Sequence, residues 1–164
     1  MFVSNAGIVL LHHFLHRFFK NISLVSDSKF KDGDCAVKAI LLLHYLATGQ
    51  KEAEEYDLVV AKLLCGYSIS DPVEKQSKIS EEEFKEAEEL LSDLVQQWSI
   101  LKNTSADGLR EAFLQRRGKL YESNERLHLH MEASSIDVLL DYLPWNLSII
   151  RLPWMQQQLH VDWR

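Results

Sequence analysis

The fold of this chain is decided near its C-terminus, by the stretch Leu143-Pro-Trp-Asn-Leu-Ser-Ile-Ile-Arg-Leu-Pro-Trp-Met155 and then by Leu159-His-Val-Asp-Trp163. Three of the four tryptophans lie in these two segments, and two Leu-Pro-Trp tripeptides enclose a short β-branched run. Tryptophan stabilises most when its large ring is buried, in a core or against a partner. These segments therefore predict a small closed β unit or a docking surface. No catalytic motif accompanies them, which favours a structural or assembly role.

The hydrophobic period changes from 3.6 to 2 after Gly118. Apolar and polar residues alternate in 127–132 and again in 159–163, which predicts two strands. The run 147–152 is a third strand candidate, and 119–122 is a weaker fourth. Apolar residues at helical spacing in 136–143 predict one further helix, which the following proline stops.

Helical spacing dominates the chain before Gly118. The clearest predicted helix covers 80–101, where Ser80 and Glu83 form a capping box and a heptad seam favours packing within the chain. Polar composition at 21–33 and a loop signal at 67–79 predict connections. The other predicted helices are 4–20, 34–48, 54–65 and 105–116.

This order of elements predicts an α+β fold, with about five to six helices followed by a small C-terminal antiparallel sheet. We expect one compact domain, in which residues 118–164 form a β-rich subdomain packed on a helical body of residues 1–117. The predicted helix 4–20 is apolar around most of its circumference. We therefore expect it at the centre of the core or covered by a partner.

The composition restricts the possible partners. The net charge of −6 lies entirely before residue 110, where 17 acidic residues outnumber 11 basic ones. An acidic chain without a basic stripe is a poor nucleic-acid binder, so we expect no nucleic acid. Cys35 and Cys65 form no C-x-x-C pair and are expected as reduced, buried thiols.

The N-terminal residues are apolar but do not predict a targeting or membrane segment. The first charged residue is Arg17, whereas a secretory signal begins with positive charge. The longest early apolar run, 6–11, is far too short to span a bilayer. We expect no membrane span and a cytoplasmic product, with export by another route left open.

Histidines are the main candidates for chemistry. His12 and His16 have the i, i+4 spacing of a zinc site, but the glutamate that usually stands beside the first histidine is absent. On the predicted strands, further side chains would converge on a metal if the strands pair, although alternation of this kind is also typical of a solvent-facing sheet. These side chains are His128, His130, Glu132, His160 and Asp162.

Other catalytic signals are missing from the sequence. It contains no nucleophile elbow and no phosphate-binding glycine cluster, and neither cysteine has a basic, polar context. We therefore expect a protein that is not an enzyme and binds no cofactor. A metal-dependent enzyme built on the strand histidines and carboxylates is the alternative.

The segment 109–120 is a stronger candidate for protein interaction. It combines arginine forks with an aromatic ring, which is the composition of interface hot spots. The alternative is a helix C-terminus whose cations suit the helix dipole, followed by a glycine cap. The wide apolar surface of 4–20 is a second candidate. The predicted protein-binding residues are Arg110, Phe113, Arg116, Trp145 and Trp154.

Six stretches, taken in order, carry a resemblance to a known family. They are Asn5–Leu11 with Phe14-Leu15, Leu42–Gly49, Lys62–Gly66, Leu101–Ser105, Leu109–Leu120 and Leu143–Trp163. They resemble the conserved end of contractile injection system tape measure proteins, from phage-tail-like particles of the antifeeding-prophage and virulence-cassette type. The ordered set covers nearly the whole chain, although no single stretch is specific.

The resemblance implies an assembly function without enzymatic activity or cofactor. A tape measure protein sits within the growing inner tube and sets its length, and its terminal regions engage the baseplate hub or the capping machinery. The implied partners are baseplate hub, inner-tube or cap proteins, and a homo-oligomer is also open. The implied location is the cytoplasm during assembly, then a particle that is either released or membrane-associated.

The sequence departs from the family pattern at a few positions. His13 and His16 stand where prolines are common, Arg117 replaces a frequent glutamate, and Gln158 replaces a proline. A continuous first helix is expected because the helix-breaking prolines are absent. None of these changes removes a known catalytic group.

Length restricts the role of this chain. A single helix of 164 residues would reach roughly 250 Å at 1.5 Å per residue, but loops and strands interrupt it. We therefore expect a globular end domain, cut as a fragment or encoded as a short relative, whose role is docking. A generic protein-binding adaptor outside injection particles is the remaining alternative.

Overall fold

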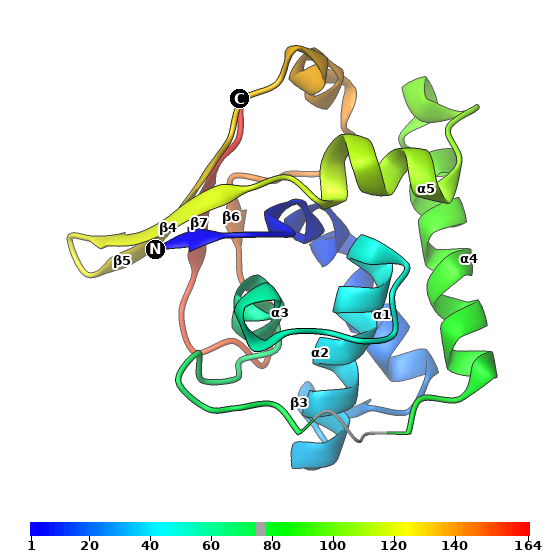
Figure 1. The fold of residues 1–164 in the computed structure, drawn as a ribbon, viewed down its shortest axis with the longest axis vertical. Helices are drawn as coiled ribbons and strands as arrows, with labels where there is room; N and C mark the ends of the chain where they lie inside the picture. Colours follow the sequence, from blue (N-terminus) through cyan, green and yellow to red (C-terminus); the bar gives the residue numbers. More distant parts are fainter. Residues whose placement is uncertain (75–77) are drawn as a thin grey trace.

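The computed structural model describes residues 1–74 and 78–164 and has the predicted α+β class. The long helices lie to one side of a sheet, and the hairpin β4–β5 projects beyond them (Figure 1). The helices are η1 (Ala6–Leu11), α1 (His12–Asn21), α2 (Gly33–Thr48), η2 (Glu55–Asp57), α3 (Val59–Leu64), α4 (Glu81–Gln97), η3 (Ser99–Leu101), α5 (Ala106–Leu109), η4 (Arg110–Leu114) and η5 (Ser135–Tyr142). The strands are β1 (Phe2–Val3), β2 (Val25–Ser26), β3 (Lys29–Phe30), β4 (Gly118–Ser123), β5 (Arg126–Met131), β6 (Ile149–Ile150) and β7 (Leu159–Asp162).

Local signals define the two longest helices. The side chain of Asp32 accepts a hydrogen bond from the Cys35 amide at the start of α2, and Gly49 ends that helix with a φ of 72°. At α4 the predicted capping box between Ser80 and Glu83 is present in both directions. The heptad seam that begins at Phe84 is buried within the chain, which confirms intramolecular packing.

The main sheet includes an N-terminal strand, which corrects the prediction of a purely C-terminal antiparallel sheet. Its order is β1-β4-β5-β7-β6. Met1 and Leu120 exchange two backbone hydrogen bonds of 3.0 and 2.8 Å, which extend the pairing of β1 with β4. β5 and β7 run parallel, so the sheet is mixed. A two-residue strand shows no period, and alternation does not reveal strand direction, so the sequence pattern missed both.

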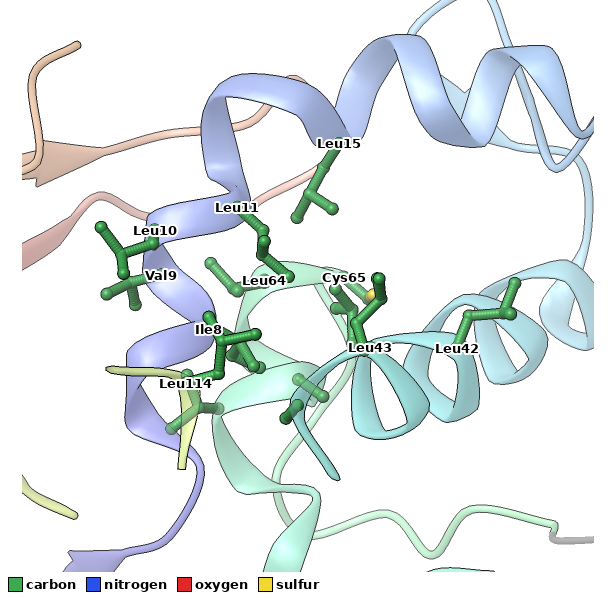
Figure 2. Close-up of a cluster of buried hydrophobic side chains, with 14 of the residues drawn as sticks. Ile8, Val9, Leu10, Leu11, Leu15, Leu42, Leu43, Leu64, Cys65 and Leu114 are labelled. Atoms are coloured by element: carbon green, nitrogen blue, oxygen red, sulfur yellow. The ribbon is translucent and has the colours of Figure 1, made fainter. Parts of the chain in front are cut away.

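The prediction of a continuous first helix is wrong. The part called η1 is a 3-10 helix, and the chain changes direction where α1 follows it (Figure 2). Gly7 gives the reason, because a Cβ there would lie 1.7 Å from the carbonyl oxygen of Phe113. The two backbones therefore cross in contact. This tertiary contact overrides the local preference for a regular α-helix.

Four other segments differ from prediction in type or extent. The predicted helix 105–116 continues beyond α5 as a π-helix, η4, and the predicted helix 136–143 is the 3-10 helix η5. The third strand candidate shrinks to β6, and a small hairpin, β2–β3, occupies part of the predicted connector 21–33. Short elements such as these depend on tertiary contacts more than on local pattern.

One hydrophobic cluster joins the helices to the sheet. Figure 2 shows side chains of η1 pointing toward Leu43 of α2 and Leu64 of α3.

Both cysteines are free, and burial raises the pKa of the Cys65 thiol. The domain boundary at residue 117 stays a prediction, although paired strands β1 and β4 come from its two sides. Within the described ranges, no helix is both long and apolar enough to cross a membrane.

Candidate interaction site

Arg110, a predicted docking residue, lies inside the molecule with 4% of its surface exposed. Its Nε donates a hydrogen bond of 3.0 Å to the carbonyl of Leu46, and a terminal nitrogen lies 2.7 Å from the Glu88 carboxylate. Gln115 donates a hydrogen bond of 3.1 Å to the neighbouring carbonyl of Ala47. The last carbonyls of a helix have no partner within it, so these side chains complete the C-terminus of α2.

Phe113 and Arg116 are also occupied within the chain. The Phe113 ring is 1% exposed, and its centroid lies 4.9 Å from that of Trp98. Arg116 holds both oxygens of Asp137, at 2.7 and 3.0 Å, and its guanidinium lies over the Trp163 ring. Both side chains are less than one-tenth exposed, so the ion pair is buried. It links η5, which contains Asp137, to the helical body.

The alternative interpretation of this segment is half right. Arg116 donates a hydrogen bond of 2.8 Å to the Ala112 carbonyl of its own segment, whereas Arg110 donates to a carbonyl of α2. Gly118 does not cap a helix; it opens β4, where a Cβ would lie 3.1 Å from the carbonyl oxygen of His130. We place docking elsewhere, because the polar atoms of Arg110 and Arg116 bond within the chain.

The segment with the two Leu-Pro-Trp tripeptides, residues 143–155, forms a strap across the first helices and the end of α3. The indole N–H of Trp145 donates to the Leu10 carbonyl at 3.2 Å, and that of Trp154 donates to the Leu64 carbonyl at 2.7 Å. Because buried helix carbonyls cannot bond to water, the indole of Trp145 provides a donor to η1, and that of Trp154 provides one to the end of α3. The strap thus covers η1 from within the same chain.

Two of the predicted residues, Trp145 and Trp154, are only half-buried, and other rings surround them on the surface. His13 stacks on Trp145 with centroids 5.0 Å apart and planes 4° apart, and His16 meets Trp154 edge-on at 5.5 Å. Phe30 lies 5.1 Å from Trp154. We call these five rings the aromatic row. The exposed imidazoles and half-buried indoles together form a surface rich in hot-spot residue types.

The sequence interpretation missed the histidines of the aromatic row. The sequence indicates metal spacing for His12 and His16 and assigns no contact to His13, yet the structure places His13 and His16 each against a different tryptophan. Their departure from the prolines common in the resembled family was the available signal. His12, on the inner side, donates from Nε2 to the Asn146 carbonyl at 2.7 Å, and burial lowers the pKa of its ring.

A second surface is the outer face of the main sheet, which the helical body does not cover. Cross-strand rows of side chains form it, and the inward side chains, such as Leu120 and Leu129, are buried. His128 stacks between Tyr121 and His160, and both ring distances are 5.2 Å. The outer sheet face comprises Phe2, Lys119, Tyr121, Arg126, His128, His130, Ile149, His160 and Asp162.

The strand residues proposed as metal ligands do lie on this face, but they make other contacts. His130 pairs with Asp162 at 2.7 Å, and His128 stacks on His160. Glu132 lies beyond β5 and is exposed. Among the residues that the structure describes, no group of three or more His, Cys, Asp and Glu side chains is arranged to hold a metal ion. The metal-enzyme alternative therefore gains no geometric support.

Comparison with known proteins identifies the chain by family alone. Residues 1–163 match the family described as contractile injection system tape measure protein. No curated protein and no solved structure matches the chain. Because the family match spans essentially the whole length, the chain belongs to the contractile injection system tape measure protein family.

Proposed function

We propose that this chain is a non-enzymatic docking domain of a tape measure protein, and that its aromatic row binds a baseplate hub, inner-tube or cap protein of a contractile injection particle. The observation that carries the proposal is the pair of half-buried tryptophans whose indole N–H groups bond to backbone carbonyls. Each ring is held in one orientation before a partner arrives. Little side-chain entropy is then lost on binding.

The shape of the chain favours docking over measuring. The longest helix, α4, has 17 residues and spans about 26 Å at 1.5 Å per residue. A folded body of this kind does not extend along a tube, so we assign length setting to the assembled system and anchoring to this chain. We place it in the cytoplasm during assembly and in the finished particle afterwards.

Binding to separately purified hub, inner-tube and cap proteins tests the proposal. His13→Glu and His16→Glu place charges on the aromatic row at exposed positions, and we expect each to weaken binding to one of the three proteins. Trp145→Phe removes part of the ring and the N–H donor, and should cost about 2 kcal/mol of binding, near 30-fold in Kd. Biolayer interferometry measures these changes.

Tyr142→Ala is the matched control, because Tyr142 is 63% exposed in the adjacent η5 but lies outside the aromatic row. It should leave binding unchanged. Deleting the chain from the particle operon should give tubes of uncontrolled length or none. Wild-type affinity in folded aromatic-row variants, or normal particles after the deletion, would refute the proposal. Binding only to proteins unrelated to the particle would instead favour the generic adaptor.

A further inference from the structure

The outer sheet face combines positive charge with exposed apolar side chains. Lys119 and Arg126 are exposed cations, and three histidines lie between them, whereas the one carboxylate of the face, Asp162, already contacts His130. Phe2 is 86% exposed, and Ile149 is 50% exposed. These two side chains lie on β1 and β6, at opposite edges of the face, with the cations and histidines between them. Exposed large apolar side chains on one face are typical of a protein contact.

A hollow beside this face adds shape to the surface. Its volume is about 460 Å³, and Arg126, Ile149, Arg151 and His160 line it together with Glu125 and neighbouring glutamines. Two of its four charged or ionisable side chains are arginines, with one carboxylate among them. The hollow therefore extends the positive character of the face toward the tip of the β4–β5 hairpin.

Helix α4 presents a surface of opposite charge. Glu82, Glu86, Glu89 and Asp93 follow at i, i+4, i+7 and i+11, so they form one stripe, and all four are exposed. Within the described part of the chain, no ion pair or side-chain hydrogen bond involves any of them. Lys85 flanks the stripe on the side away from α1.

The α4 stripe borders a shallow groove with an apolar floor. The groove between α1 and α4 measures about 190 Å³ and contains Phe18 and Leu90, with Arg17 on the α1 side. Glu86, Glu89 and Asp93 form its other lip. Such a groove suits an aromatic side chain next to a cation, which is the pairing that Tyr121 and Lys119 present on the hairpin.

We infer that the outer sheet face of one copy of this chain docks on the α4 stripe of a second copy, head to tail. α4 lies on the side of the molecule away from the sheet (Figure 1), so the two surfaces do not compete for the same space. Packing two sheet faces together would bring cations against cations, and two stripes would bring carboxylates against carboxylates. Only the heterologous contact pairs opposite charges.

This contact is independent of the docking function proposed above, because it does not use the aromatic row. A head-to-tail contact leaves one surface of each type free at the ends, so it can repeat. Because the contact is electrostatic and exposed, it weakens as salt increases. The chain should therefore associate at low ionic strength despite its net charge of −6.

Sedimentation velocity of the purified full chain tests the inference. At low ionic strength the average mass should increase with concentration above the 19.0 kDa of a single chain, and it should return to that value in high salt. Two double variants each remove one surface: Lys119→Ser with Tyr121→Ser for the sheet face, and Glu86→Lys with Glu89→Lys for the stripe. We expect each to weaken self-association at least about tenfold.

Mixing the two double variants is the decisive measurement. Each retains one intact surface, so the mixture should form a one-to-one dimer, at twice 19.0 kDa, that does not grow further. Glu111→Lys, a charge reversal at an exposed site outside both surfaces, is the control and should associate as wild type. A monomeric wild type at all concentrations would overturn the inference. So would a mixture that stays monomeric, or double variants that associate normally with unchanged circular dichroism.

Discussion

The π-helix η4 and the strap both contain arginine and large aromatic side chains. They differ in whether those aromatic side chains point into the core or lie at the surface. The π-helix η4 directs Arg110 and Phe113 into the interior, where they are almost fully buried. The strap directs Trp145 and Trp154 along the surface, where both stay half-buried. The same residue types therefore serve as internal fasteners in one segment and as surface rings in the other.

The difference follows from the number of hydrogen bonds that each side chain needs. A guanidinium has five N–H donors, and the end of α2 together with Glu88 and Asp107 offers several acceptors in one place. An indole has one N–H, which a single carbonyl satisfies while part of the ring remains accessible. Composition alone does not separate these outcomes; the local supply of acceptors does.

Gly7→Ala should have the largest effect, because it acts where η1 crosses η4. The new methyl group would lie 1.7 Å from the Phe113 carbonyl oxygen, so the crossing must open. We expect a loss of about 4 kcal/mol or more in the free energy of unfolding, measured by urea denaturation. Gly33→Ala is the control, because nothing lies within 4 Å of a Cβ there. A small effect of Gly7→Ala would mean that η4 is held less tightly than the structure indicates.

Arg110→Met should come second. It leaves the buried carbonyl of Leu46 and the partly exposed carboxylate of Glu88 without their donor. We expect a loss of about 3 kcal/mol in thermal or urea unfolding. Arg117→Met, at an exposed side chain, should change stability by less than about 0.5 kcal/mol. Equal effects of the two substitutions would remove the distinction between η4 and an ordinary surface helix.

Trp154→Phe should have a smaller effect, which sharpens the contrast with η4. It removes the indole donor to the Leu64 carbonyl but keeps an aromatic ring against Phe30. We expect a loss of about 1 kcal/mol in the free energy of unfolding. Tyr142→Phe, at an exposed ring, serves as the control. A cost as large as that of Arg110→Met would show that the strap belongs to the core.

The smallest expected effect is on how the free energy of unfolding depends on pH. It involves one histidine next to the strap and one in α2. Burial lowers the pKa of His12, which contacts the strap, and of His44 in α2, below 6.5. The unfolded chain then binds more protons, so this stability is fully present above pH 6.5 and is lost as the pH falls from there toward the folded-state pKa values.

His12→Gln and His44→Gln should each flatten that loss in urea titrations made at several pH values. The effect of His44 has a structural basis, because its Nδ1 is buried without a hydrogen-bond partner among the described residues. Protonation would turn this nitrogen into a buried donor without an acceptor, because the other ring nitrogen already donates to the Glu52 carbonyl. If stability still fell with pH as in the wild type in both His12→Gln and His44→Gln, these two histidines would not be the cause of the loss.

Local patterns predicted the elements that carry their own signals. The capping box of α4, the seam that begins at Phe84, and the alternation around β5 and β7 all depend on neighbours within a few residues. The α+β class follows from their order. The hairpin turn at Asn124 and Glu125, both with positive φ, was not predicted, because neither residue is the glycine that usually marks such a turn.

The candidate site was predicted only in part. Trp145 and Trp154 were identified from their unusual density near the C-terminus, and the structure places both beside the surface rings of α1. Arg110 and Arg116 could not be separated from surface arginines, because their acceptors lie far away in the chain, at Leu46 and Asp137. Hydrogen-bond partners so distant in sequence leave no periodic signal.

By itself, the sequence determined the helices with caps, the alternating strands, the family and the position of the tryptophan-rich end, because each depends on local spacing or on an ordered set of motifs. Only the tertiary structure decided that β1 joins the sheet, that η1 is a 3-10 helix and that Arg110 points inward. The physical reason is that burial and hydrogen-bond satisfaction are settled between segments more than 60 residues apart, as in the bond from Arg110 to Leu46.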